Sequence, residues 1–188
     1  MKNVLIIYTG GTIGMTRTEN GYAPQSGQFR RAMEAIPDLY AEQMPRWDML
    51  EMDPLLDSSN MTVHEWNKIA QLVADHYDAY DGFVVLHGTD TMAYTACALS
   101  YLVQQSGKPI VLTGAQKSIY MQDTDARRNL YDAFVAAQDD NLAGVYIVFD
   151  GRVILGTRAR KTRTKSMNAF SSIDSVSYTH LTLPTKLE

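Results

Sequence analysis

The sequence of 188 residues predicts a three-layer α/β/α domain, in which helices cover both faces of a mostly parallel β-sheet. Three observations predict this fold. Short apolar runs alternate along the chain with amphipathic stretches of about 10–15 residues, which is the pattern of strands joined by helices. The runs are largely apolar throughout, as is typical of strands buried on both faces. Turn residues and hydroxyl groups follow several runs directly, where open α/β sheets bind their ligands.

The first strand is predicted at residues 4–7, and a turn with three glycines follows it within residues 8–14. Glycines let the backbone turn sharply and approach a ligand closely. Residues 15–25 are polar and rich in turn residues, so we expect a mobile surface loop there. Its single aromatic residue, Tyr22, either packs on its neighbours or belongs to a lid over the glycine turn.

The next part of the chain is predicted to contain helices on either side of a second strand. Apolar residues at helical spacing occupy residues 29–36, and residues 47–52 have the composition of a strand. Residues 62–65 have the form of a capping box, which begins a further helix. Ser58 and Ser59 therefore lie in a strand-to-helix loop.

The third predicted strand, residues 83–86, delivers the sequence HGTDT of residues 87–91 at its carboxyl end. A helix follows, then a strand at 109–112 and a helix at 123–138. Two short apolar runs within 145–155 flank an Asp-Gly dipeptide, which predicts a β-hairpin.

The composition indicates an ordinary globular protein of one domain. A net charge of −4 argues against a nucleic acid as the main partner. Cys97 is the single cysteine, so no disulfide can form within the chain. The first apolar run is too short for a signal peptide, and no stretch approaches the ~20 apolar residues of a membrane span. We therefore expect a cytoplasmic protein without a membrane partner.

Three predicted strand ends carry hydroxyl groups. Thr12 follows the first strand, Ser58 and Ser59 follow the second, and Thr89 follows the third. Asp90 adds a carboxylate beside Thr89. A threonine hydroxyl is a poor nucleophile at neutral pH and needs a base or a lowered pKa nearby.

A lysine can supply such a base when it is desolvated or lies beside other cations. The candidate lies within residues 156–163, just after the predicted hairpin. Glycines at positions 10, 11 and 88 are expected to leave backbone N–H groups free to face a developing oxyanion. This set of groups suits acyl transfer without a metal or a cofactor.

Competing motifs fit less well. The glycines are not followed by the Lys-Ser/Thr of a P-loop, their spacing is not that of a dinucleotide site, and no Gly-x-Ser-x-Gly elbow occurs. His87 has no partner at zinc-ligand spacing, and His64 and His76 are interpreted as surface residues. Residues 158–165 hold five cations, which form either a phosphate or nucleic-acid patch or, as we favour, a solvated face.

Two of these segments resemble the signature motifs of a known family. Residues 9–14, TGGTIG, and residues 87–92, HGTDTM, are similar to the two motifs of the bacterial-type L-asparaginases. The resemblance is closest to the cytoplasmic type I branch and covers roughly residues 3 to 174 in the family's order. It implies an amidohydrolase that converts L-asparagine into L-aspartate and ammonia.

The resemblance also implies catalytic roles. Thr12 would be the nucleophile that attacks the side-chain amide carbon and forms an acyl-enzyme, and Tyr22 would assist it from a loop that closes over the site. Thr89, Asp90 and Lys161 would form a second triad, with Lys161 near Thr89 and oriented by Asp90.

The same resemblance implies substrate-binding residues. Ser58, with the backbone of Asp57 and Gly88, would hold the α-carboxylate end of the substrate, and Asp90 would hold its ammonium group. The carbonyl of Ala115 would accept a hydrogen bond from the amide. No metal is implied.

Ser59 departs from the glutamine of the secreted branch. This difference bears on the choice between glutamine and asparagine and fits the cytoplasmic branch. A tRNA-dependent amidotransferase shares both motifs in its amidase subunit, and this is the first alternative function. The second is a binding or sensor module that keeps the fold without turnover.

Members of this family continue into a smaller C-terminal α/β domain, which we expect to be missing here. Residues 1–175 are assigned to the N-terminal catalytic domain. Residues 176–188 resemble an in-frame translation of a transposase sequencing adapter and are assigned to a non-native tail, the alternative being a genuine threonine-rich strand. In the family, a neighbouring subunit closes the active site. We therefore expect a homodimeric or homotetrameric parent, and little or no activity from the 188-residue chain alone.

Overall fold

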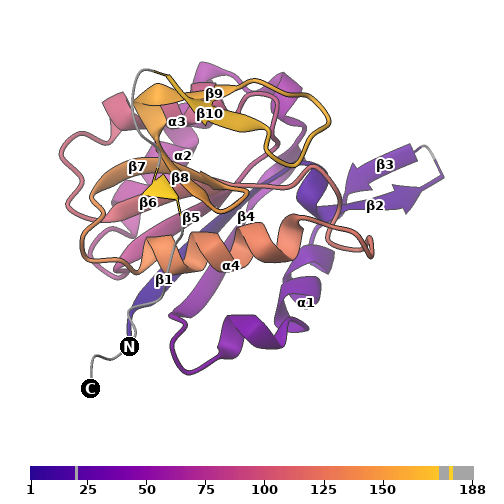
Figure 1. The fold of residues 1–188 in the computed structure, drawn as a ribbon, viewed down its shortest axis with the longest axis horizontal. Coiled ribbons are helices and arrows are strands. Elements are labelled where there is room, and N and C mark those ends of the chain that lie inside the picture. The colour runs from indigo at the N-terminus through magenta and orange to yellow at the C-terminus, as the bar shows by residue number, and fades with distance from the viewer. Residues whose placement is uncertain (20, 174–177, 180–188) are drawn as a thin grey trace.

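The central sheet contains seven strands among the described residues, which are residues 1–19, 21–173 and 178–179 of a computed structural model. Across the sheet the strands lie in the order β11 (Tyr178–Thr179), β8 (Arg152–Leu155), β7 (Gly144–Phe149), β6 (Pro109–Thr113), β5 (Gly82–Leu86), β1 (Asn3–Gly10) and β4 (Arg46–Leu56). The strands from β7 to β4 are all parallel, whereas β8 pairs antiparallel with β7 and β11 pairs antiparallel with β8. The predicted α/β class with a mostly parallel sheet is confirmed (Figure 1).

Four α-helices cover the two faces of this sheet in the described part of the chain: α1 (Gln28–Glu34), α2 (Val63–Asp75), α3 (Met92–Leu102) and α4 (Ala126–Ala137). Alternate side chains of a strand point to opposite faces. Ile6 of β1 accordingly lies in one core with Phe134 of α4. Its neighbour Ile7 lies in a second core with Ile69 of α2 and Leu99 of α3. The uninterrupted apolar sequence of β1 is thus explained by burial on both sides.

The predicted hairpin after the parallel strands is present. β7 and β8 pair in antiparallel register, and Asp150 and Gly151 between them have φ values of 50° and 72°. Two consecutive positive φ values are those of the tight turn that Asp-Gly favours. The capping box at α2 is also present, with the Thr62 hydroxyl accepting from the His64 N–H and Glu65 accepting from the Thr62 N–H.

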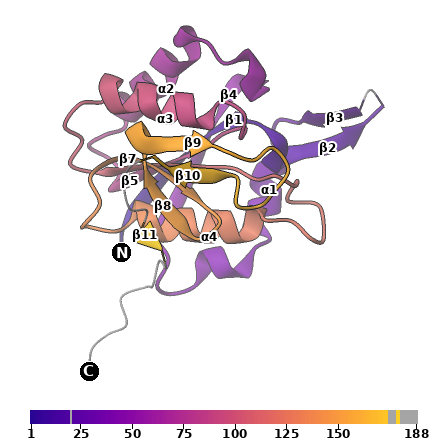
Figure 2. The ribbon, with the colours of Figure 1, turned by 45° about the horizontal axis from the view of Figure 1, so that its top comes forward.

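Two small antiparallel sheets and four 3₁₀ turns complete the described structure. The small sheets pair β2 (Met15–Thr18) with β3 (Gly21–Pro24), and β9 (Ala159–Lys161) with β10 (Phe170–Ser172). The 3₁₀ turns are η1 (Thr12–Gly14), η2 (Pro37–Tyr40), η3 (Ser58–Asn60) and η4 (Gly156–Arg158). In both ribbon views the β2–β3 hairpin projects away from the rest of the molecule (Figure 2).

The prediction of an irregular loop at residues 15–25 was wrong over most of its length. Met15 pairs with Pro24 and Thr18 with Gly21, and the Thr18 hydroxyl donates to the Gly21 carbonyl at 2.9 Å. The strands were missed because a hairpin that projects into solvent buries little apolar surface, so its sequence lacks the alternation that marks a strand. Residue 20 lies outside the described residues.

Most of the predicted non-native tail, residues 176–188, also lies outside the described residues. Within it only residues 178–179 are described, as the short strand β11 that pairs with β8. In the described part of the chain, no helix has the length and apolar character needed to cross a membrane.

Candidate active site

Three loops at the carboxyl ends of β1, β4 and β5 touch one another through glycines. A Cβ atom on Gly11, whose φ is +86°, would lie 2.6 Å from the Gly88 Cα. A Cβ on Gly88 would in turn lie 2.5 Å from the Ser58 hydroxyl oxygen. Only glycine permits backbones to approach so closely. The loops that carry Thr12, Ser58 and Thr89 therefore meet at one place, as the sequence predicted.

The turn after β1 is held in place by the neighbouring strand. The Gly11 N–H donates to the Leu56 carbonyl of β4 at 3.1 Å, and a Cβ on Gly10 would lie 2.3 Å from that same oxygen. The prediction that the Gly11 N–H is free to face an oxyanion was therefore wrong, because the sheet pairing between β1 and β4 extends into the turn. Thr12 begins η1 directly after it and is half-buried.

The second predicted triad is assembled by contacts between residues far apart in the sequence. Lys161 of β9 donates from Nζ to the Thr89 hydroxyl oxygen at 2.8 Å and to the Asp90 Oδ1 at 2.7 Å. Thr89 is 7% exposed, and the side chains of Lys161 and Asp90 are 13% and 67% exposed. A shielded ammonium thus bridges a buried hydroxyl and a carboxylate that faces solvent.

Gln116 is a further member of this cluster that the sequence did not predict. Its side-chain amide nitrogen, Nε2, donates to the carbonyls of Thr164 and Ser166 at 3.1 and 3.0 Å. Its Oε1 therefore faces the Thr89 hydroxyl, which donates to it at 3.2 Å. Thr89 thus accepts a hydrogen bond from Lys161 and donates one to Gln116. The only sequence signal was the position of Gln116 directly after the predicted substrate contact Ala115.

The predicted substrate-binding residues lie around the same loops. Ser58 is 3% exposed, and its carbonyl accepts from the Thr91 hydroxyl at 2.7 Å, which ties the second loop to the third. Asp57 is exposed, and its Oδ1 accepts from the N–H of Ser59, which is also exposed. Ala115 is buried after β6.

Tyr22 is not brought to the nucleophile position in this structure. It lies on β3 in the projecting hairpin and is 61% exposed. Among the described residues, no hydrogen bond connects it with Thr12. The structure therefore places Thr12, Ser58, Thr89 and Asp90 in connected loops and Lys161 of β9 against the last two of these residues, whereas Tyr22 stays on the exposed hairpin.

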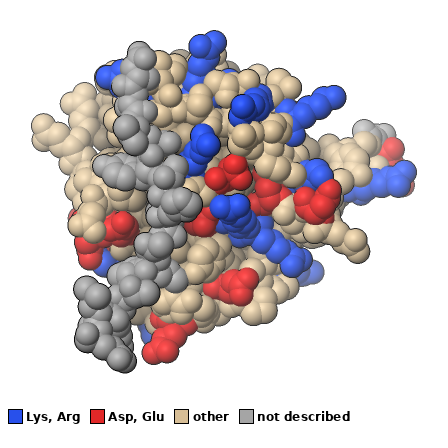
Figure 3. All heavy atoms as spheres, in the orientation of Figure 1, with Lys and Arg blue, Asp and Glu red and all other residues tan. Residues whose placement is uncertain are grey.

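A cavity of about 770 Å³ adjoins this cluster and is lined by Asp90 and Lys161 together with Tyr94, Arg160 and Arg163. Figure 3 views one face of the molecule and shows basic side chains near its upper edge and both acidic and basic side chains across its middle. Opposite charges are thus both present on this face. In the described part of the chain, no group of three or more His, Cys, Asp or Glu side chains could hold a metal ion.

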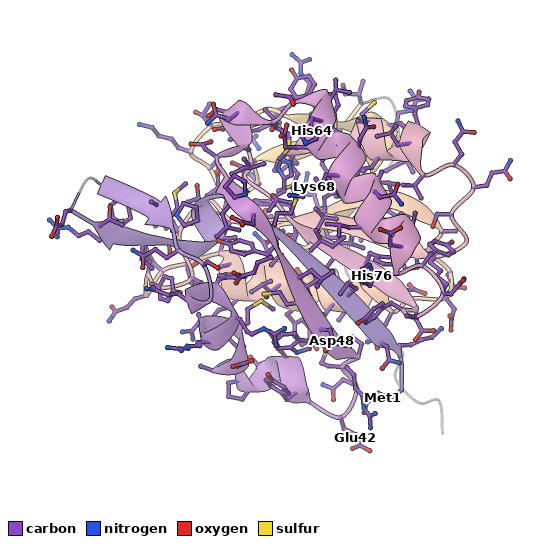
Figure 4. All side chains as sticks on the ribbon, turned by 180° about the vertical axis from the view of Figure 1, so that it is seen from behind. Met1, Glu42, Asp48, His64, Lys68 and His76 are labelled. Carbon is purple, nitrogen blue, oxygen red and sulfur yellow. The ribbon has the colours of Figure 1, made fainter. Side chains whose placement is uncertain are left out.

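A second cavity, of about 630 Å³, lies at the opposite end of the sheet and takes no part in this cluster. Met1, Glu42 and Asp48 line it, and Figure 4 shows them together near one end of β1 and β4. The same view shows His64 on α2, away from that cavity, whereas His76 follows α2 directly and its ring centroid lies 6.3 Å from that of Tyr80, which lines the cavity.

Comparison with known proteins gives one family. The family model described as "Asparaginase, N-terminal" matches residues 3–183. L-asparaginase 1 of Escherichia coli (strain K12) is 43% identical over 171 residues, which are 91% of this chain and 51% of that protein. The crystal structure of L-asparaginase I from Vibrio cholerae has a TM-score of 0.85 and 42% identity, covering 94% of this chain and 52% of its own.

A relative of a different kind is also similar. A glutamyl-tRNA(Gln) amidotransferase subunit of Methanopyrus kandleri is 34% identical over 188 residues, which are 94% of this chain and 40% of that protein. The chain thus spans about half the length, or less, of the curated relatives described here.

Proposed function

The chain belongs to the asparaginase family, and on that premise we propose that it is the catalytic N-terminal domain of an enzyme that hydrolyses L-asparagine to L-aspartate and ammonia. The observation that carries this proposal is the contact of Lys161 with both Thr89 and Asp90, next to the glycine contacts that join the Thr12, Ser58 and Thr89 loops. A lysine so placed can exchange a proton with a threonine hydroxyl.

In the proposed reaction, the Thr12 oxygen attacks the side-chain amide carbon of asparagine. The carbon–nitrogen bond breaks, ammonia leaves with the proton of the hydroxyl, and an ester with Thr12 remains. Water then hydrolyses this ester and releases aspartate. Thr89, Lys161 and Asp90 supply the proton transfers, and Ser58 with the Asp57 and Gly88 backbone holds the α-carboxylate.

Two observations support these roles. The buried Thr89 hydroxyl accepts a hydrogen bond from Lys161 and donates one to Gln116, so its orientation is defined. Ser58 lies against Gly88 and is almost fully buried, which favours a fixed anion-binding position over a mobile one. Tyr22 lies on an exposed hairpin, so its proposed assistance to Thr12 requires that hairpin to close over the site.

The test compares ammonia release by three proteins. These are the 188-residue chain, a hybrid that joins residues 1–173 to the part of E. coli L-asparaginase 1 beyond its match, and the hybrid with Thr12→Ala. We expect little or no activity from the chain alone, activity in the hybrid, and loss of at least ~1000-fold in kcat with Thr12→Ala, because the nucleophile is removed.

Aspartate binding by the Thr12→Ala hybrid provides the control, since a folded site should still bind the product. An unchanged rate with Thr12→Ala would refute the nucleophile assignment. Turnover by the chain alone at the rate of the hybrid would refute the need for a second domain.

The second candidate function is the amidase part of a tRNA-dependent amidotransferase, because the amidotransferase subunit of M. kandleri is 34% identical to this chain. Free asparagine separates the two functions. An asparaginase releases ammonia from it without RNA, whereas release that occurs only with an aminoacylated tRNA and a partner protein would favour the second candidate.

We also propose a cytoplasmic enzyme that assembles as a homodimer or homotetramer. Ser59 supports this location, because it departs from the glutamine of the secreted branch and fits the cytoplasmic branch, to which the resemblance is closest. The assembly follows from the family resemblance, which implies that a neighbouring subunit closes the active site. Size measurement of the hybrid in solution would test the assembly.

A further inference from the structure

His87 is buried beneath the Thr89 loop and takes no part in the proposed chemistry. It is 0% exposed and comes directly after β5. A chain of hydrogen bonds runs through its ring: the Trp66 indole N–H donates to the Thr95 hydroxyl at 2.9 Å, this hydroxyl lies 2.9 Å from the His87 Nε2, and the His87 Nδ1 lies 2.7 Å from the Gly88 carbonyl. The chain joins α2, α3 and the loop after β5.

Only one arrangement of hydrogens satisfies every member of this chain. An indole N–H can only donate and a carbonyl can only accept. Nδ1 must therefore carry a hydrogen, which it donates to the Gly88 carbonyl. If Nε2 carried a hydrogen, the Thr95 oxygen would accept twice and the hydroxyl hydrogen would have no acceptor in this set of bonds. The hydroxyl hydrogen is paired only when it points to an unprotonated Nε2. Every donor and acceptor is then paired, and the ring is neutral.

The burial of the ring favours the same state. Desolvation lowers the pKa of His87 to about 4, against the smaller opposing effect of its bond to the Gly88 carbonyl. The chain of hydrogen bonds ends at the Trp66 indole N–H, which does not release its proton at ordinary pH. It therefore cannot conduct protons to the site, and its effect must be on geometry.

The backbone around His87 is also held in place by its neighbours. The His87 N–H donates to the Thr113 carbonyl at 2.9 Å, and a Cβ on Gly114 would lie 2.2 Å from the His87 carbonyl oxygen. The ring then adds a restraint on the next carbonyl, that of Gly88. The residue after Gly88 is Thr89, whose hydroxyl must meet both Lys161 and Gln116.

We propose that His87 is a positioning residue, held as the neutral Nδ1-protonated tautomer by Thr95 and Trp66, which fixes the Gly88 carbonyl and thereby the Thr89 hydroxyl against Lys161. Only its catalytic consequence rests on the proposed function. Thr95 is the residue through which this can be tested, because it is fully buried and its hydroxyl is the link between the ring and α2.

The first measurement is ¹⁵N NMR of the histidine rings in the whole 188-residue chain near pH 7. For His87 we expect the shift of a protonated nitrogen at Nδ1 and that of an unprotonated nitrogen at Nε2. A ring with its hydrogen on Nε2, or a ring protonated on both nitrogens, would overturn the proposal.

The second measurement is the exchange of the Nδ1 hydrogen with solvent in two variants. Thr95→Val removes the hydroxyl but keeps the shape, and we expect exchange on the order of tenfold faster because the ring loses one of its two anchors. Thr95→Ser should restore slow exchange. Equal exchange in the Val variant and the unsubstituted chain would contradict a role for Thr95.

Thr113→Val is a matched control, since Thr113 is equally buried and its hydroxyl donates to the Val148 carbonyl, outside the chain of bonds. The substitution keeps the Thr113 backbone carbonyl that accepts from the His87 N–H, so we expect the exchange rate of the His87 Nδ1 hydrogen to be unchanged. A change as large as that of Thr95→Val would show that any lost buried hydroxyl has this effect, and would overturn the proposal.

The catalytic consequence is measured in the hybrid enzyme. We expect Thr95→Val to lower kcat on the order of tenfold with KM almost unchanged, and Thr95→Ser to restore it. Equal kcat in the Val and unsubstituted hybrids would contradict positioning of Thr89. An unsubstituted hybrid without asparaginase activity would count against the proposed function alone, because the tautomer is measured independently of turnover.

Discussion

At the scale of single residues, Gln116 gives a sharp test of how Thr89 is held. Its amide accepts from the Thr89 hydroxyl and donates to two carbonyls of the loop between β9 and β10. Gln116→Met keeps the length of the side chain and removes all three bonds. We expect kcat of the hybrid to fall about tenfold, which corresponds to the loss of ordinary hydrogen bonds around the hydroxyl.

Gln116→Glu sharpens this prediction, because it keeps an acceptor for Thr89 but directs a second carboxylate oxygen at the Thr164 and Ser166 carbonyls. We therefore expect kcat of the Gln116→Glu hybrid to be no higher than that of the Gln116→Met hybrid at neutral pH. Gln138→Met is the matched control: Gln138 is a glutamine whose Nε2 also donates to a carbonyl, that of Gln43, away from the site. If Gln116→Met and Gln138→Met have the same kcat, Gln116 does not position Thr89.

Some of the site residues could be predicted from the sequence and others could not. Thr12, Ser58 and Thr89 were placed at strand ends by the apolar runs that precede them, and the structure brings their loops together. The Lys161 contact with Thr89 spans 72 positions and required the resemblance, because no local pattern specifies which lysine returns to the sheet. Gln116 was missed since a single glutamine after a strand has no distinguishing pattern.

At the scale of elements, the start of α2 is the clearest agreement between sequence and structure, and it supports a stability prediction. The Thr62 hydroxyl accepts from the His64 N–H, and Glu65 accepts from the Thr62 N–H at 2.9 Å. Thr62→Ala removes the hydroxyl at the cap, and we expect the free energy of unfolding to fall by about 1 kcal/mol. Thr62→Ser keeps the hydroxyl, so we expect a much smaller decrease in the free energy of unfolding, as measured by urea unfolding. Equal losses in both variants would contradict the capping role.

The elements also explain where prediction failed. Helices and parallel strands were found because burial on one or both faces imposes a period on the sequence. The β2–β3 hairpin projects into solvent, so no period marks it (Figure 2). The Gly11 N–H was thought to be free because the sequence shows that a strand ends, whereas the partner strand that still binds the turn, β4, is known only from the sheet order.

At the scale of the whole molecule, the order of the sheet decides which loops meet. β1 lies between β4 and β5, so the loops after these three strands are neighbours although Thr12, Ser58 and Thr89 lie 31 to 77 positions apart in the chain. Burial of His87 beneath this junction connects the site with the global stability of the fold. Its pKa is lowered from 6.5 to about 4 by desolvation, so the folded chain holds a neutral ring where the unfolded chain would hold a charged one.

This difference predicts how stability depends on pH. Between about pH 6.5 and pH 4 the unfolded state binds a proton at His87 and the folded state does not, so the free energy of unfolding decreases as the pH falls. The stabilisation is fully present above pH 6.5, and a shift of this size corresponds to a loss of about 3 kcal/mol by pH 4.

Other groups also titrate over this range, so the prediction concerns a difference between two proteins. His87→Gln cannot take up the proton, and its unfolding free energy should fall about 3 kcal/mol less between pH 7 and pH 4 than that of the unsubstituted chain. Urea unfolding at several pH values measures both. Should His87→Gln not fold, ring NMR of the unsubstituted chain decides instead, since His87 must remain neutral at pH 5. If the free energy of unfolding changes equally with pH in both proteins, or if ring NMR shows an imidazolium at pH 5, burial does not keep this ring neutral.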